Sequence, residues 1–155
     1  MMDFIRKLAC RICHSGDKPK PELPLFFKDA QAIRNELQAL GLTSLYPGLM
    51  DASYFYATGE DWARALSYIL FEFERPKWVA ERFDCDDAAF LLHSLFASFF
   101  GLNTCAVAFG TIPSGYHSWN LLRTDVGWLQ FEPQTGEIFE LGDPLKQYKP
   151  EVVLL

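Results

Sequence analysis

Three residue types that can together perform acyl transfer stand far apart in the sequence, as Cys85, His117 and Glu132. A thiolate attacks the acyl carbon, an imidazole takes the thiol proton, and a carboxylate fixes the imidazole tautomer and stabilises the imidazolium. Cys85 directly follows Asp84, a good helix N-cap, so the thiol is expected in the first turn of a helix. Free backbone N–H groups and the positive end of the helix dipole favour a thiolate there. The three residues therefore predict a Cys-His-Glu catalytic triad.

The histidine and the glutamate fall in two successive runs with a β-strand pattern. His117 belongs to the run at 116–124 and Glu132 to the run at 127–134, with a turn between them. Alternation along a strand places His117 and Trp119 on one face, and Glu132 on one face of the neighbouring strand. If these faces match, His117 lies between the thiol and Glu132, as a base and its orienting carboxylate require.

The other histidines do not fit the role of the base. His93 stands eight residues after Cys85 on the same expected helix, which places it about 12 Å further along the axis. A histidine in that position is expected to be satisfied by a backbone carbonyl. His14 lies in the N-terminal segment, away from the expected helix and strands.

Three carboxylates surround the cysteine and oppose its ionisation. Asp84, Asp86 and Asp87 place negative charge at the end of the helix where a thiolate would form. Two explanations remain open. The carboxylates cap the helix and pair with bases such as Arg82, or they bind a divalent cation such as Ca²⁺ or Mn²⁺ through hard oxygen ligands, with Asp86 and Asp87 as candidates.

The remaining pattern predicts one α+β domain. Residues 1–24 form a tail and a proline-rich linker, and residues 25–155 form the domain. The third helix is apolar on nearly every side and is expected to be a buried central helix. Helices are expected between Asp29 and Leu40, between Gly59 and Pro76, and between Asp84 and Gly101. Strands are expected at 104–112, 116–124, 127–134, 138–141 and 151–155.

Composition excludes several classes of function. Of the 155 residues, 50% are hydrophobic and 22% charged, which suits a compact core. The net charge is −6 and the 14 basic residues are scattered, so nucleic acid is not an expected partner. The longest apolar run, near residues 88–100, is shorter than the roughly 20 residues of a membrane span. A soluble protein without a membrane span is expected, and its oligomeric state stays open.

The four cysteines are expected to be reduced. The N-terminus lacks the apolar region of a secretory signal, which indicates a cytoplasmic protein. Cys10 and Cys13 with His14 fit a haem-attachment motif, but covalent haem requires export, so no haem is expected. No nucleotide cofactor is expected either.

Several of these segments together resemble a known family. The segments are the sequence around Trp78, the run Asp84-Cys85-Asp86-Asp87-Ala88, the run Tyr116-His117-Ser118-Trp119-Asn120 and the run Phe131-Glu132-Pro133-Gln134-Thr135-Gly136. They are similar to the C-terminal domain of mushroom agglutinins related to the fairy-ring lectin. That domain is a papain-like, calcium-activated cysteine protease. The resemblance covers roughly residues 60–140, and the D-C-D-D and F-E-P-Q-T-G segments are its most specific part.

The resemblance implies a role for each matching residue. It makes Cys85 the nucleophile, His117 the base and Glu132 the orienting carboxylate, with Trp78 and Gln134 lining the substrate site. It also implies calcium activation. The sugar-binding β-trefoil of these agglutinins has no counterpart here, so no carbohydrate-binding domain is expected.

The sequence therefore predicts a thiol protease or amidase, a cysteine-dependent hydrolase acting on a peptide or amide substrate. The expected fold is papain-like or transglutaminase-like, with a central Cys-bearing helix packed on an antiparallel sheet. One alternative is a transglutaminase-like acyl transferase, because the segments around His117 and Glu132 are also similar to that family. A second alternative is a non-catalytic binding module on the same fold. Loss of a triad residue would mark such a module, and none is lost.

Overall fold

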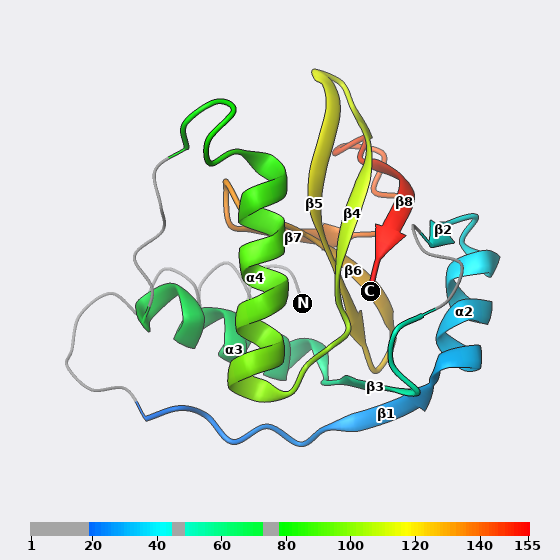
Figure 1. Ribbon diagram of the computed structural model, residues 1–155, viewed down its shortest axis with the longest axis vertical. Coiled ribbons are helices and arrows are strands. Elements are labelled where there is room, and N and C mark those ends of the chain that lie inside the picture. The colour runs from blue at the N-terminus through cyan, green and yellow to red at the C-terminus, as the bar shows by residue number, and fades with distance from the viewer. Residues whose placement is uncertain (1–18, 45–48, 73–77) are drawn as a thin grey trace.

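A computed structural model describes residues 19–44, 49–72 and 78–155 (Figure 1). The described residues form an α+β fold with three helices, a six-stranded sheet and a two-stranded ribbon. The elements in chain order are β1 (Phe26–Asp29), α2 (Ala30–Ala39), β2 (Thr43–Ser44), β3 (Ser53–Tyr56), α3 (Gly59–Glu72), α4 (Cys85–Phe100), β4 (Cys105–Ile112), β5 (Gly115–Thr124), β6 (Gly127–Glu132), β7 (Glu137–Glu140) and β8 (Lys149–Leu154).

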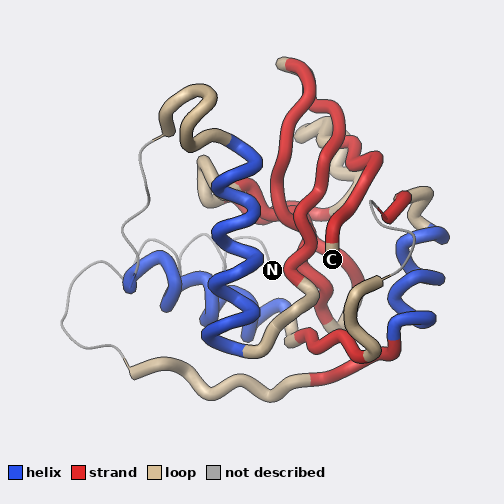
Figure 2. Tube along the Cα trace, in the orientation of Figure 1, coloured by secondary structure: helices blue, strands red, loops and turns tan. Residues whose placement is uncertain are grey.

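The large sheet, whose strands are red in Figure 2, has the strand order β2-β8-β4-β5-β6-β7. All neighbouring strands are antiparallel except β2 and β8, which are parallel. Successive side chains of a strand point to opposite faces of a sheet, and both faces are covered here. Leu121 packs in the cluster that contains Ile33 of α2, and Leu122 packs with Phe96 of α4. The sheet therefore separates two hydrophobic cores.

Helix α4 begins and ends where the sequence predicts. Gly101 follows it with φ of +66°, a left-handed conformation that glycine adopts without steric cost. The prediction that this helix is buried on nearly every side is wrong. Phe90 is 38% exposed and Leu91 36% exposed, because the helix packs against strands on one side and faces solvent on the other. Phe96 on its inner side contacts Trp62 of α3 edge-on at 4.9 Å.

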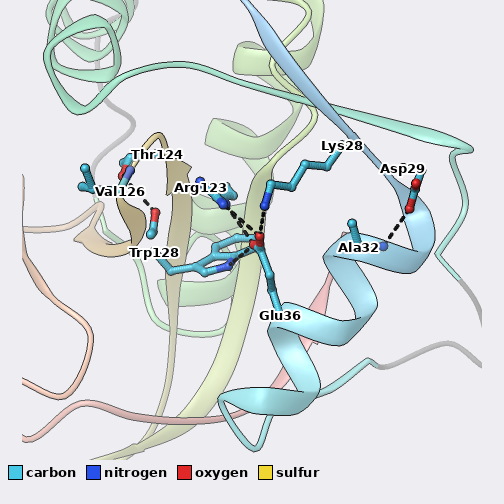
Figure 3. A network of polar contacts seen from close by, with 9 residues as sticks. Lys28, Asp29, Ala32, Glu36, Arg123, Thr124, Val126 and Trp128 are labelled. Atoms are coloured by element: carbon cyan, nitrogen blue, oxygen red, sulfur yellow. Dashed lines mark hydrogen bonds and ion pairs between the residues drawn. The ribbon is translucent and has the colours of Figure 1, made fainter.

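Helix α2 is joined to the opposite face of the sheet by Glu36 (Figure 3). Arg123 donates to the Glu36 carboxylate from Nε at 2.9 Å and from Nη2 at 2.8 Å, and Lys28 and Trp128 also donate to it. Burial alone would raise the pKa of Glu36. The hydrogen bonds and charges of Arg123 and Lys28 outweigh burial and lower this pKa to about 2.

The predicted elements are mostly confirmed. Asp29 caps α2 by accepting a hydrogen bond from the Ala32 amide at 2.7 Å, and strands β4 to β8 lie near their predicted positions. The last two strands do not pair with each other, since β7 pairs with β6 and β8 with β4. The strands β1, β2 and β3 were not predicted. Most of the predicted tail, residues 1–18, lies outside the described residues. None of the described helices is long and apolar enough to cross a membrane.

Candidate functional site

The structure brings the three predicted triad residues to one end of the sheet. Nε2 of His117 on β5 lies 2.7 Å from Oε2 of Glu132 at the end of β6. The thiol of Cys85, in the first turn of α4, lies near the backbone of Ser118, the residue after His117, which lowers the thiol pKa. The contact between His117 and Glu132 confirms that the relevant faces of β5 and β6 match, whereas the predicted contact between the thiol and the imidazole stays a prediction.

The Glu132 carboxylate is buried and fully hydrogen-bonded. It is 2% exposed, yet it accepts hydrogen bonds from three donors. Oε2 accepts from His117 at 2.7 Å and from the Tyr148 hydroxyl at 3.0 Å, while Oε1 accepts from the Gln134 amide at 2.9 Å. Buried polar groups require such partners. Nδ1 of His117 makes no hydrogen bond within the part of the chain that the structure describes.

Tyr148 is a member of the site that the sequence did not reveal. It lies in the segment between β7 and β8, and its ring meets Trp119, Phe139 and His117 edge-on at 5.1, 4.8 and 6.0 Å. No periodicity marks this segment. Only the long-range pairing of β8 brings Tyr148 beside a carboxylate that precedes it by 16 residues.

Gly110 permits the approach of the segment that carries Tyr148. Gly110 pairs with His117 across β4 and β5, and the register of β4 against β8 shifts at this point. A Cβ added to Gly110 would lie 2.1 Å from the carbonyl oxygen of Lys149. The backbone next to Tyr148 can therefore lie close to β4 only because residue 110 has no side chain.

Polar contacts at successive turns fix α4 against the sheet. Cys85, Ala89 and His93 are spaced four residues apart on one face of the helix. The Asn120 amide donates to the carbonyl of Ala89 at 3.0 Å, and His93 Nδ1 lies 2.7 Å from the carbonyl oxygen of Cys105. The expectation that His93 is satisfied by a backbone carbonyl is confirmed. These contacts hold α4 against β5 and β4.

The acidic residues before and after Cys85 have different roles. Ligand atoms of Asp84, Cys85 and Asp86 lie within 4.8 Å of one another. A hydrogen bond between the two carboxyl groups lowers the pKa of Asp84, and the same bond together with burial raises the pKa of Asp86. Asp87 instead accepts a hydrogen bond from the Asp84 amide at 3.2 Å and caps the helix.

This group of three donors fits a divalent cation in part. Of the two predicted metal ligands, Asp86 belongs to the group and Asp87 does not. Ca²⁺ takes six to eight oxygen ligands, so two carboxylates and a thiol would have to be supplemented by water or by a ligand.

The surroundings of Cys85 oppose its ionisation. Burial raises the pKa of the thiol, the hydrogen bond from the Ser118 backbone lowers it, and the charges of Asp84 and Asp86 raise it further. The net effect is upward. The helix dipole favours a thiolate, as the sequence indicates, whereas burial and two adjacent carboxylates raise the thiol pKa in the structure.

Two exposed aromatic rings lie on segments that border the site. Trp78 is 61% exposed and lies in the loop before α4, while Tyr116 is 65% exposed and precedes His117 on β5. The loop and the β4–β5 hairpin lie at the same end of the molecule (Figure 1). Gln134, the other predicted substrate-site residue, has an exposed side chain in the turn after β6. Tyr116 was noted in the sequence only as part of a motif.

Two solved structures have a similar fold. A complex of PSL1a with E64 gives a TM-score of 0.64 and 24% identity, and covers 83% of this chain and 50% of its own. Polyporus squamosus lectin bound to the human-type influenza-binding epitope Neu5Acα2-6Galβ1-4GlcNAc gives a TM-score of 0.61 and 22% identity, with 83% and 49% covered. The chain thus spans about half the length of each neighbour. No protein-family model and no curated protein sequence matches the chain.

These neighbours change several expectations. The likeness to an agglutinin-type lectin is confirmed at the level of the fold. The prediction of a cysteine protease or other hydrolase is corrected, because the neighbours include a lectin in complex with a carbohydrate epitope. The same finding corrects the predicted peptide or amide partner and the expectation that no carbohydrate-binding domain is present.

Proposed function

We propose that this chain is a non-catalytic carbohydrate-binding module on a papain-like or transglutaminase-like fold. Its site is the end of the sheet at which His117 meets Glu132 and Cys85 lies near the backbone of Ser118. The observation that carries the proposal is the pair of exposed rings, Trp78 and Tyr116, on the segments that border these polar groups.

The aromatic rings and the polar groups match the two kinds of surface that a sugar presents. Indole and phenol rings offer flat apolar faces on which the C–H face of a sugar can stack. His117, with Nδ1 unengaged among the described residues, offers a hydrogen-bonding group for a hydroxyl. Binding sites commonly combine an apolar surface with a few placed polar groups.

The state of Cys85 favours binding without turnover. The raised pKa of its thiol leaves it protonated at neutral pH, and a thiol is a much weaker nucleophile than a thiolate. The charges of the adjacent Asp84 and Asp86 carboxylates raise this pKa further. The site in this form holds a polar sulfur and not an activated nucleophile.

The fold neighbours support the class of ligand. Polyporus squamosus lectin is bound to a sialylated trisaccharide epitope, and its fold is shared over 83% of this chain. Because the chain spans about half of that lectin, the position of the site rests on the residues of this chain alone.

Glycan-array screening followed by calorimetry tests the proposal. Neu5Acα2-6Galβ1-4GlcNAc is included in the array. We expect Trp78→Ala and Tyr116→Ala each to weaken binding about tenfold, which corresponds to about 1.4 kcal/mol. Phe27→Ala is the matched control, because Phe27 is 67% exposed on β1, away from the site, and should leave affinity unchanged.

Turnover is measured in parallel. Wild type and Cys85→Ala are incubated with peptide, amide and ester substrates, and with E64, which forms a complex with PSL1a. Glycan binding with no product from either protein supports a binding module. Product that forms with wild type and disappears with Cys85→Ala would contradict it.

A further inference from the structure

We propose that Tyr148 is a positioning residue that, with Glu132, holds His117 in the tautomer protonated on Nε2, so that Nδ1 accepts a hydrogen bond from a ligand hydroxyl. The part about the ligand rests on the proposed function. The part about the tautomer concerns the free protein and stands on the geometry of three side chains.

The contacts of Glu132 determine which nitrogen of His117 carries the proton. The carboxylate receives hydrogen bonds from a backbone amide and from a phenol, both of which are donors. An ionised carboxylate can only accept, so Nε2, at 2.7 Å from Oε2, must be the protonated nitrogen. In a neutral imidazole Nδ1 is then an acceptor.

Tyr148 acts on this pair through its hydroxyl. Burial raises the pKa of Tyr148, and the neighbouring Glu132 charge raises it further, so the phenol keeps its proton. Its hydroxyl donates to Oε2, the same oxygen that receives the His117 hydrogen bond. Because Oε2 accepts from two donors at once, its hydrogen bond from the imidazole is weaker than it would be with one donor.

Tyr148 also acts through its ring. The His117 ring lies parallel to Trp119, with an interplanar angle of 19° and centroids 6.1 Å apart, and Tyr148 meets it edge-on. The side chain of His117 is only 12% exposed. Packed between these rings, the imidazole has little room to turn and exchange the positions of its nitrogens.

The position of Tyr148 is fixed by the strand that follows it. Lys149 begins β8, and its carbonyl lies against Gly110. Because Gly110 is the cross-strand partner of His117, the two strands bring the phenol and the imidazole together at one level of the sheet.

NMR of ligand-free protein labelled with ¹⁵N-histidine tests the inference. Wild type should show His117 as one tautomer with a slowly exchanging Nε2–H, assigned by its loss in His117→Gln. In Tyr148→Phe the ring stays, but Oε2 of Glu132 loses its second donor. The hydrogen bond from His117 becomes stronger, so the Nε2–H resonance should move downfield. In Tyr148→Ala the packing opens and the resonance should be lost to exchange with water.

Tyr68→Phe is the matched control, because Tyr68 packs against Phe99 and Phe100, away from the site. It should leave the His117 resonance in place. A Tyr148→Phe spectrum identical to wild type, or a wild-type His117 protonated on Nδ1, would overturn the inference.

Calorimetry separates the inference from the proposed function. Loss of the Tyr148 hydroxyl in Tyr148→Phe should weaken glycan binding about fivefold, which corresponds to about 1 kcal/mol. If the expected spectra are seen and no glycan binds, the function fails and the positioning role stands. If Tyr148→Phe changes neither spectrum nor affinity, the positioning role fails and the function stands.

Discussion

At Cys85, the ionisation that the position in the sequence favours differs most from the ionisation that the surrounding charges favour. Its place in the first turn of α4 would favour ionisation, whereas burial and the carboxylates of Asp84 and Asp86 oppose it. The balance of these effects, and not the position in the helix, sets the reactivity of the sulfur.

Asp86→Asn should accelerate alkylation of Cys85. Removing one of the carboxylates that raise the thiol pKa lowers this pKa, and each unit increases the thiolate fraction up to about tenfold below the pKa. We expect a several-fold faster reaction with iodoacetamide at pH 8, followed by peptide mass spectrometry. Glu151→Gln removes an equal charge on β8 and should have no effect. Equal rates in wild type and Asp86→Asn would contradict the electrostatic explanation.

Cys105 gives an internal reference in the same experiment. It is fully buried in the core that contains Leu122 and Phe96, and burial raises the pKa of its thiol far above the ordinary value. Its alkylation should be much slower than that of Cys85 in every variant.

A divalent cation should bind where the carboxylates of Asp84 and Asp86 lie close together. We propose Ca²⁺ or Mn²⁺, and a ligand that binds only the folded state adds about 2.7 kcal/mol at a hundredfold excess over its Kd. Melting curves with each cation should lie several degrees above the curve with a chelator. This difference should vanish in Asp86→Asn and persist in Asp87→Asn, which loses only a cap. Coincident wild-type curves would show that the two carboxylates hold no cation.

At the scale of elements, α2 depends on one ionised side chain for its attachment to the sheet. Glu36 connects the helix to Arg123 of β5, Lys28 of β1 and Trp128 of β6. Arg123 is only 6% exposed and also lies over the ring of Tyr56 at 4.7 Å. Neutralising Glu36 would leave a buried guanidinium without its counter-charge.

Acid should weaken this attachment in a defined pH range. The folded-state pKa of Glu36 is lowered from 4.5 to about 2, so its contribution is complete above pH 4.5 and is lost as the pH falls toward 2. Allowing for partial exposure, we expect about 2 kcal/mol. Glu36→Gln should therefore lower the free energy of unfolding at pH 7, and the difference from wild type should shrink toward pH 2. Urea titrations at both pH values measure it.

Glu60→Gln is the control for this series. Glu60 is an exposed residue in the first turn of α3 and makes no contact with the Glu36 network. It should change stability by less than about 0.5 kcal/mol at either pH. A constant difference between Glu36→Gln and wild type across the pH range would contradict the assigned ion pair.

Across the whole molecule, the features that the sequence predicts are those with local causes. Asp29 and Gly101 bound their helices through contacts within one turn, and the alternation along β5 and β6 places His117 on the same face as Glu132. Tyr148 could not be predicted, because its contact depends on how β8 pairs with β4. The thiol pKa was also out of reach, since it depends on where two carboxylates point.

The short strands were missed for a related reason. β1 and β3 have four residues each and form a separate ribbon in which Phe27 pairs with Phe55. With hydrophobic residues on both faces, β1 gives no alternation to recognise. The order of the large sheet was likewise not predictable, because it joins β2 to a strand more than a hundred residues later.

The place of β8 between β2 and β4 also governs when the site can exist during synthesis. A nascent chain leaves the ribosome from its N-terminus at about 5–20 residues per second, so β4 to β7 can pair while β8 is still missing. Tyr148 arrives only with β8. Until then Glu132 lacks one of its donors and β4 keeps an open edge. The nascent protein therefore has the thiol, the imidazole and the carboxylate before it has the hydroxyl that completes the contacts of Glu132, and its site matures last.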